Sequence, residues 1–177
     1  MIGTLATVAA LSRPDLLAQP VIQALETMNG DEVLVAPIDP DLADTAAFCE
    51  MYQVPLEVSA NCVVVAGKRE GRQRVAACVV LATTRADVNT VVRKRLNVRK
   101  ASFLAVDEAV DATGMEYGGI TPIGLPGDWP VLVDAAVLDI PYVIVGSGVR
   151  RSKIAIPGKA LAALPNAEVV EGLGRPV

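Results

Sequence analysis

The sequence predicts an α+β fold: one domain over residues 1–177, built on a mixed, largely antiparallel, barrel-like sheet flanked by short helices. The first reason is length, because 177 residues suit one domain with a sizeable core. The second is composition: with 52% hydrophobic but only 3% aromatic residues, the core must consist mainly of Val, Ala, Leu and Ile. The third is the order of elements, since short strand-like runs alternate with short helical patterns and tight turns.

The first helix is expected over residues 14–28, where apolar side chains recur on one stripe. Pro14 suits the first helical position, and Pro20 should kink or split the helix. Asn29-Gly30 should end it. A short strand over 31–38 follows. The next helix is expected over residues 41–52, with Asp41 as its N-cap.

Residues 61–67 (NCVVVAG) and 73–83 (QRVAACVVLAT) are the clearest strands, because both are rich in β-branched residues. The link between them, GKREGR, is short and bounded by glycine. The two strands should therefore pair as an antiparallel hairpin.

Residues 86–97 predict a helix capped by Asp87. Arg95 falls within its apolar stripe rather than opposite it. Either its aliphatic stem snorkels to the surface, or the stripe borders a polar cleft.

The remaining elements follow the same two periodicities. Strands are expected at 101–106, 130–134, 142–148 and 152–158, and helices or helical turns at 107–114, 135–139 and 159–166. Gly114 should end the helix before it, and the tail EGLGRPV should fray.

The chain contains no histidine. This excludes Ser-His-Asp and Cys-His catalysis and histidine-ligated metals, so catalysis must use backbone groups, carboxylates, lysine, water or the substrate's own groups. Cys49, Cys62 and Cys78 lie in apolar contexts without a CxxC pair, which indicates buried reduced thiols. Neither a metal nor another cofactor is expected.

The net charge of −4 indicates that the chain as a whole is not a polyanion binder, although local patches can be. No apolar run has the length of a membrane span, and the N-terminal stretch lacks the basic region of a signal peptide. A cytoplasmic protein without a membrane partner is expected.

Residues 118–124 read GGITPIG. By composition the segment is a structural turn, because glycine and proline mark turns generally. Its surroundings suggest more. It ends the run TRADVNTVVRKRLNVRKASFLAVDEAVDATGMEYGGITPIG, which is followed by PVLVDAAVLDIPYVIVGSGVRRSKIAIPGKAL.

This ordered set resembles the YbaK/ProX family of aminoacyl-tRNA editing domains over about residues 40–170. The family similarly has a capped basic helix, an ASFAS-like strand, a helix before a GGxxPxG loop, a VLVD strand and a VxxGxG strand. The resemblance implies a free-standing hydrolase that cleaves the ester of a tRNA mischarged with a small amino acid. An aminoacyl-tRNA synthetase is a further implied partner, and the tRNA's own hydroxyls assist the attack of water.

The resemblance also implies a site. Gly118, Gly119 and Pro122 would form the loop that holds the amino-acid end, since glycine lets the backbone approach and proline fixes its shape. The expected substrate-binding residues around them are Ile120, Thr121, Gly124, Asp134, Gly146, Ser147, Gly148 and Lys153. Asp134 is equally well explained as the N-cap of the segment that follows it.

One position departs from the family. Where the family has a lysine at the start of the strand after the helix, this chain has Asn61 in SANCVVVAG. Asparagine can donate and accept hydrogen bonds but supplies no cation. Lys68 would lie ~20 Å along the strand, whereas Lys153 is a more attractive replacement. Two functions stay open: an active hydrolase that uses Asn61, or an altered or inactive member that binds tRNA or an aminoacyl-like small molecule.

Nine of the sixteen Lys and Arg residues gather in two short segments, which could form one positive face for the acceptor end of tRNA. The expected contacts are Arg93, Lys94, Arg99, Lys100, Arg150 and Arg151. The alternative is a solvated helix and loop. A third function class, a purely structural or interaction protein, would be favoured if no pocket lay beside residues 118–124.

Overall fold

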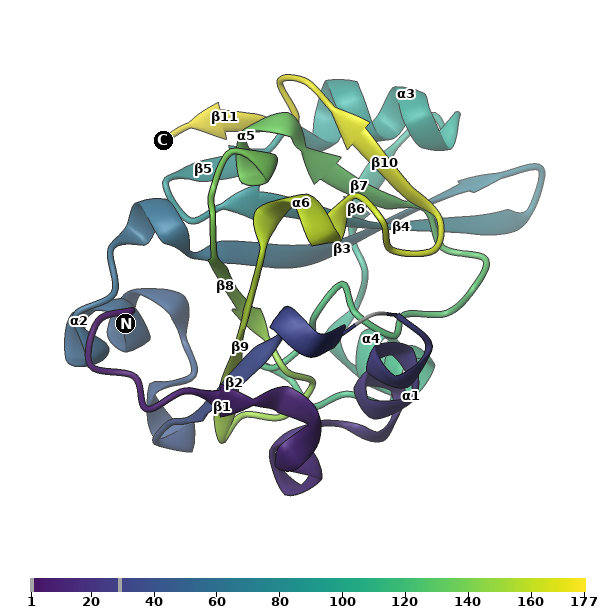
Figure 1. Ribbon diagram of the computed structural model, residues 1–177. Coiled ribbons are helices and arrows are strands. Elements are labelled where there is room, and N and C mark those ends of the chain that lie inside the picture. The colour runs from purple at the N-terminus through teal and green to yellow at the C-terminus, as the bar shows by residue number, and fades with distance from the viewer. Residues whose placement is uncertain (1, 29) are drawn as a thin grey trace.

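The computed structural model describes residues 2–28 and 30–177 and contains two main sheets with short helices around them (Figure 1). The first sheet has the order β1-β2-β9-β8, and all its neighbours are antiparallel. Its strands are β1 (Val8–Ala9), β2 (Leu34–Pro37), β9 (Ser152–Ile156) and β8 (Val143–Gly146).

The second sheet is mixed, with the order β10-β7-β4-β3-β6. Its strands are β10 (Ala167–Val170), β7 (Val131–Asp134), β4 (Arg72–Leu81), β3 (Ala60–Arg69) and β6 (Ala101–Phe103). Strand β7 is parallel to both β10 and β4, whereas β3 is antiparallel to both β4 and β6. The hairpin expected from the GKREGR turn is confirmed, with Ala60 opposite Leu81 and Arg69 opposite Arg72.

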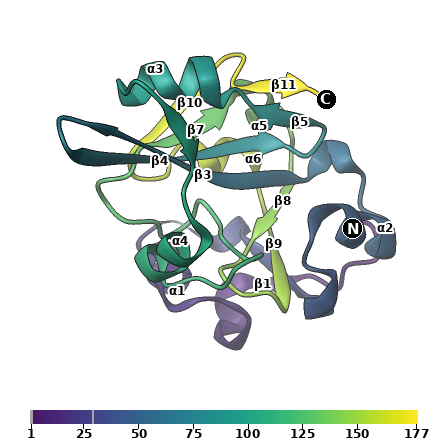
Figure 2. The same cartoon turned by 180° about the vertical axis from the view of Figure 1, so that it is seen from behind.

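The two sheets meet at one point. Ser59, directly before β3, forms a parallel bridge to Ile144 of β8. From there the sheets diverge, so the strands curve round a common core without closing a barrel (Figures 1 and 2). This confirms the expected α+β class with a mixed, barrel-like arrangement of strands.

The helices are short. They are α1 (Gln19–Thr27), α2 (Thr45–Tyr52), α3 (Arg93–Leu96), α4 (Val106–Thr113), α5 (Ala135–Leu138) and α6 (Gly158–Leu161). A π-helical turn, Val88–Val92, leads into α3 and is capped by Asp87, whose side chain accepts from Thr90 N. Among the described residues, no helix combines the length and apolar character that crossing a bilayer requires.

Five 3-10 turns complete the N-terminal third: Ala10–Ser12, Pro14–Leu16, Gly30–Glu32, Pro40–Leu42 and Leu56–Val58. The helix expected over 14–28 is split, as Pro20 suggests, into the turn at Pro14–Leu16 and α1. Its expected end at Asn29-Gly30 includes a residue, Asn29, that lies outside the described residues.

Two other expectations were wrong. Asp41 does not cap the second helix, because it lies in a separate 3-10 turn, Pro40–Leu42, whose N-cap is Asp39. Helix α2 begins at Thr45, and its N-cap is Asp44, whose side chain accepts a hydrogen bond from Ala47 N. The tail does not fray. A short strand, β11 (Gly174–Pro176), pairs with β5 (Thr84–Ala86), and Leu173 before it is fully buried.

The main apolar cluster fills the space between the sheets and is covered by α1, α5 and α6. A second cluster lies on the outer face of the β3–β4 sheet beneath α3. A third surrounds Phe48 of α2, which is fully buried against the first sheet. The third cluster fixes α2 beside the point where the sheets diverge.

Candidate functional site

A pocket of about 370 Å³ lies where the two sheets diverge. Four segments form it: the start of β3, the paired ends of β8 and β9, the start of α2, and the first part of the GGITPIG loop. Its lining residues are Ala43, Asp44, Thr45, Ala60, Asn61, Cys62, Val63, Tyr117, Gly118, Ile120, Gly146 and Lys153. The pocket beside residues 118–124 removes the main reason for favouring a purely structural protein.

Asn61 is held in this pocket by a residue of α2. Thr45 Oγ1 donates to Asn61 Oδ1 at 2.6 Å, in a half-buried environment. Because the amide oxygen is engaged, the Asn61 Nδ2 group remains as a donor for a ligand.

The strand that carries Asn61 has an open edge here. Strand β6 pairs only with Val65–Gly67 of β3, and Leu104 N then donates to Val64 O. Backbone groups alternate along a strand, so the N–H and C=O of Cys62 face the same side as Val64 O, beyond the end of β6. The pocket wall therefore offers backbone hydrogen-bonding groups as well as side chains.

Lys153 lies on the opposite wall and is only 8% exposed. Its Nζ donates to Ala43 O at 2.9 Å and lies 5.3 Å from the centre of the Phe48 ring. Burial lowers the pKa of Lys153, although Cys49 and Asp44 act in the opposite direction. No carboxylate forms an ion pair with Lys153 in the described part of the chain.

The glycine loop packs backbone to backbone against the turn between β8 and β9. Gly148 N donates to Gly119 O at 2.7 Å, and Glu116 N donates to Gly148 O at 2.9 Å. A Cβ on Gly119 would lie 2.8 Å from the Val149 backbone, and one on Gly146 would lie 2.7 Å from Gly119 O. Close approach of two chain segments therefore requires glycine on both sides.

The Arg150 side chain connects two segments that contribute residues to the pocket. Its guanidinium donates to Tyr117 O at 3.1 Å and to Pro40 O at 3.0 Å, while its backbone N–H donates to Glu116 Oε1 at 2.8 Å. The side chain thus links the start of the glycine loop to the segment before α2. Two of its five donors are used in this way, which gives Arg150 a structural role that the expected tRNA contact did not include.

The structure brings together five of the expected residues: Asn61, Gly118, Ile120, Gly146 and Lys153. The second half of the loop turns away. Pro122 and Gly124 line a separate cavity of about 330 Å³ with Pro20 and Pro126. Thr121 is fully buried, and its hydroxyl has no hydrogen-bond partner in the described structure.

Three further expected residues are structural. Ser147 is fully buried, with its hydroxyl bonded to Val149 O and Ser152 O. Gly148, at φ +87°, packs against Ala18. Gly119 is buried where the glycine loop packs against the β8–β9 turn. None of these three residues lines the pocket.

Asp134 also lies elsewhere. It occupies the N-cap position of α5, as the alternative expectation held, without a side-chain capping bond of the usual kind. Burial raises its pKa, and nearby backbone N–H groups, first that of Gly174, offset part of this effect. Its carboxylate therefore lies between the start of α5 and the C-terminal strand rather than in the pocket.

The basic residues form two separate groups. Arg93, Lys94, Arg99 and Lys100 belong to α3 and the segment after it, near the top of Figures 1 and 2, whereas Arg150 and Arg151 lie in the β8–β9 turn in the lower half. Arg151 Nη2 donates to Asp15 O at 2.7 Å. The single positive face that the sequence suggested is not formed.

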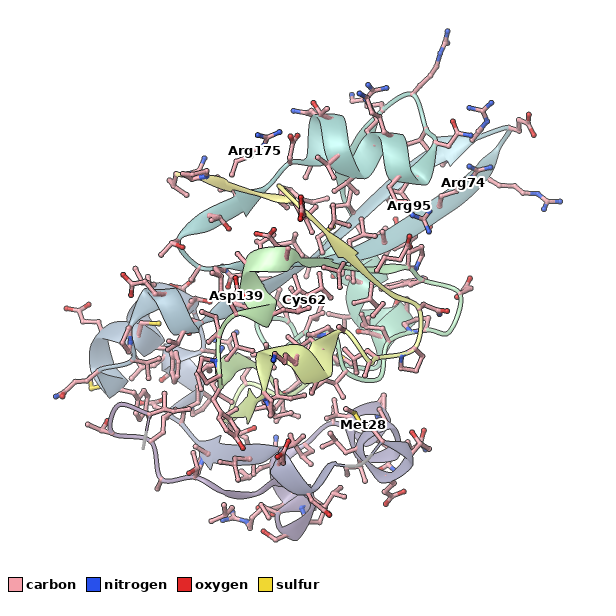
Figure 3. All side chains as sticks on the ribbon, turned by 45° about the horizontal axis from the view of Figure 1, so that its top comes forward. Met28, Cys62, Arg74, Arg95, Asp139 and Arg175 are labelled. Atoms are coloured by element: carbon pink, nitrogen blue, oxygen red, sulfur yellow. The ribbon has the colours of Figure 1, made fainter. Side chains whose placement is uncertain are left out.

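The hairpin adds basic residues to the α3 group. Arg69 donates to Asn97 Oδ1 at 3.0 Å and Arg74 donates to Leu96 O at 2.9 Å, which ties the hairpin to the end of α3. Figure 3 shows Arg74 and Arg95 together at this end. Arg95 reaches the surface and pairs with Glu168 of β10, as the snorkelling alternative expected.

The pocket also contains three polar residues that were not expected there: Asp44, Thr45 and Tyr117. The signal for the first two was present, because Asp-Thr before an apolar run is a helix start. The expected start of this helix at Asp41 placed both residues inside the helix instead of at its N-terminus. Cys62, near the centre of Figure 3, was expected to be a buried thiol. It is partly buried and also lines the pocket. Burial raises the pKa of its thiol. Its thiol is therefore neutral at physiological pH.

The comparisons with known proteins agree with this arrangement. The family model described as "Aminoacyl-tRNA editing domain" matches residues 39–164, which include all the pocket-lining residues. The chain belongs to the aminoacyl-tRNA editing domain family. The expected family resemblance, to editing domains of the YbaK/ProX type, is thereby confirmed.

Solved structures share the fold of this editing domain. One, described as a "putative trans-editing enzyme for prolyl tRNA synthetase", is 20% identical, with a TM-score of 0.72 over 93% of this chain and 97% of that one. Another, "hypothetical protein APE2540", is 18% identical, with a TM-score of 0.76 over 89% of this chain and 100% of that one.

Proposed function

We propose that this editing domain acts in trans as a deacylase, hydrolysing the ester that joins a small amino acid to the end of a mischarged tRNA. The observation that carries the proposal is the pocket in which Asn61, the first half of the glycine loop and Lys153 converge. Its position within the segment matched by the editing family supports the same reaction. So does the description of the trans-editing relative.

The pocket has hydrogen-bond donors suited to an ester carbonyl. Within the described residues, no hydrogen bond engages the N–H of Gly118 or Ile120, and both residues line the pocket. Together with Asn61 Nδ2 they can bind the carbonyl oxygen as negative charge develops on it. Water attacks the carbonyl carbon, and the ester bond to the ribose oxygen breaks.

Small side chains around the pocket favour a small amino acid such as alanine, serine or cysteine. Ala43, Ala60, Gly118 and Gly146 contribute little bulk. Size exclusion is worth only about 1–3 kcal/mol per methylene, so the pocket selects a size class rather than one amino acid.

A second candidate rests on Asn61 itself. An amide that is bonded to Thr45 supplies no charge, which favours a module that binds tRNA or an aminoacyl-like small molecule without hydrolysing it. The partners common to both candidates are the acceptor end of tRNA and an aminoacyl-tRNA synthetase that presents it.

A panel of alanyl-, seryl- and cysteinyl-tRNAs distinguishes the two candidates. The deacylase proposal expects wild type to release at least one amino acid faster than buffer does, and Asn61→Ala to slow that release. Binding of the same tRNAs without release, together with turnover gained by Asn61→Lys, would instead establish the binding module.

A further inference from the structure

We propose that the ammonium group of Lys153 is the oxyanion-binding cation of this pocket and remains protonated throughout the reaction. This inference rests on the proposed deacylase function and adds the charge that Asn61 lacks. As water adds to the ester carbon, a new C–O bond forms and the carbonyl electron pair moves onto oxygen. Lys153 stabilises that oxyanion. The pair then returns, the ester bond breaks, and the leaving ribose oxygen takes up the proton that water releases, which regenerates the ribose hydroxyl.

Lys153 is a buried side chain with unused hydrogen-bond donors. An ammonium group has three N–H donors, and the described structure assigns only one of them, to Ala43 O. The face of Phe48 provides partial compensation. A buried charge without an ionic partner is costly to a fold, and an anionic oxygen of a ligand bound in the pocket would offset that cost.

The position of Lys153 is fixed by an interior strand of the first sheet. Strand β9 lies between β2 and β8, and Lys153 is paired with Ala36 on one side and Gly146 on the other. Its neighbours Ser152 and Ile154 are both buried. A group held on a rigid strand is preorganised for charge that develops at one place.

A ligand can reach the amine of Lys153 from the side of Gly146 and Asn61. Gly146, opposite Lys153 in the ladder, also lines the pocket and presents no side chain. Asn61 lies on the β3 wall and Lys153 on the β9 wall of the same 370 Å³ space. A carbonyl bound between these walls receives a neutral donor from one side and a cation from the other.

The charged and titratable groups around the amine act on its charge in opposite directions. Burial, the largest effect, lowers the pKa of Lys153, and Arg150 from the β8–β9 turn adds to this. Cys49 and Asp44, from the middle and the start of α2, favour the protonated form. Asp44 is exposed and caps α2 through Ala47 N, so it does not neutralise the amine in a closed ion pair. The amine is left to meet an anionic oxygen of the ligand.

An NMR titration tests the inference on the wild-type protein. The lysine side-chain resonances are labelled with ¹³C, and the Lys153 signal is assigned by its loss in Lys153→Met. Two probes are added separately: a phosphonate analogue of the alanyl ester at the 3′ oxygen of adenosine, and the dinucleotide cytidylyl-adenosine, which has a phosphate but no amino acid. The inference expects the phosphonate to shift the Lys153 signal. A shift with the dinucleotide only, or with neither probe, would overturn it.

Kinetics give a second readout with a matched control. Lys153→Met should lower the single-turnover deacylation rate on the order of 10²-fold with little change in tRNA affinity, as loss of an oxyanion donor does. Lys153→Arg, which keeps the charge, should retain more of the rate. Lys159→Met, at an exposed lysine of α6, should behave as wild type. Equal deacylation rates for Lys153→Met and Lys159→Met would overturn the inference. If wild type hydrolyses no aminoacyl-tRNA, the proposed function is refuted, and the NMR titration alone decides whether Lys153 binds an anionic oxygen.

Discussion

Thr45 and Asn61 are joined by a 2.6 Å hydrogen bond that links the first residue of α2 to the start of β3. The bond determines which end of the Asn61 amide is available: the oxygen is occupied and the Nδ2 group is left for a ligand. It also fixes the distance between two walls of the pocket. A residue that never needs to touch substrate can therefore control how substrate is held.

Replacing Thr45 with valine should reduce deacylation without unfolding the protein. The change keeps the shape of the side chain but leaves Asn61 Oδ1 unpaired, so the amide can rotate and lose its orientation. We expect kcat/KM to fall about tenfold, which corresponds to one hydrogen bond of about 1.4 kcal/mol. Thr45→Ser, which retains the hydroxyl, is the control, and a valine variant as active as the serine variant would exclude this role.

Replacing Gly119 with alanine should destabilise the fold. The added Cβ would lie 2.8 Å from three backbone atoms of Val149, so the loop and the β8–β9 turn must move apart. Overpacking of this kind costs about 1–3 kcal/mol in the free energy of unfolding, which urea denaturation measures. Gly127→Ala is the matched control, because a Cβ there meets nothing within 4 Å. Equal stabilities of the two variants would show that the loop does not pack as described.

The pH dependence of stability should reveal the buried lysine. Burial lowers the pKa of Lys153 in the folded protein, so between that pKa and the ordinary value near 10.4 the unfolded chain binds more protons than the folded one. The stability of wild type relative to Lys153→Met should therefore rise as the pH increases through this window and stay constant below it. If the difference in unfolding free energy between wild type and Lys153→Met stays constant from neutral pH to pH 10, Lys153 titrates as an exposed lysine does.

Charge reversal at Arg93 and Lys94 should weaken tRNA binding if the α3 group contacts phosphates. Each lost phosphate contact lowers the slope of log affinity against log salt by somewhat less than one unit. The double variant Arg93→Glu, Lys94→Glu is compared with Arg13→Glu, Lys159→Glu, a pair of exposed basic residues on other parts of the surface. An unchanged salt slope for the α3 variant would remove this surface from the tRNA interface.

The sequence predicted much of the architecture because its strongest signals are local. The β3–β4 hairpin, the Asp87 cap and the helix end at Gly114 each depend on residues close together in the chain. The strands β10 and β11 were missed, since their pairing with β7 and β5 depends on distant partners rather than on strong patterns of their own.

The site was predicted less completely for a similar reason. The GGITPIG loop was found as one motif, but its two halves face different cavities, and only a three-dimensional arrangement separates them. Lys153 was selected because it lies close to a glycine-rich turn. Its approach to Ala43, 110 positions away in the chain, could not be read from spacing.

The central claim is that the pocket between β3 and β9 binds the aminoacyl end of the substrate. A crystal structure of the protein with a non-hydrolysable amide analogue of 3′-alanyl-adenosine tests it most directly. The claim predicts that the alanyl carbonyl oxygen lies within hydrogen-bond distance of Asn61 Nδ2 or Lys153 Nζ, with Gly118 beside the amino acid. An analogue bound instead in the cavity lined by Pro20, Pro122 and Pro126 would contradict it.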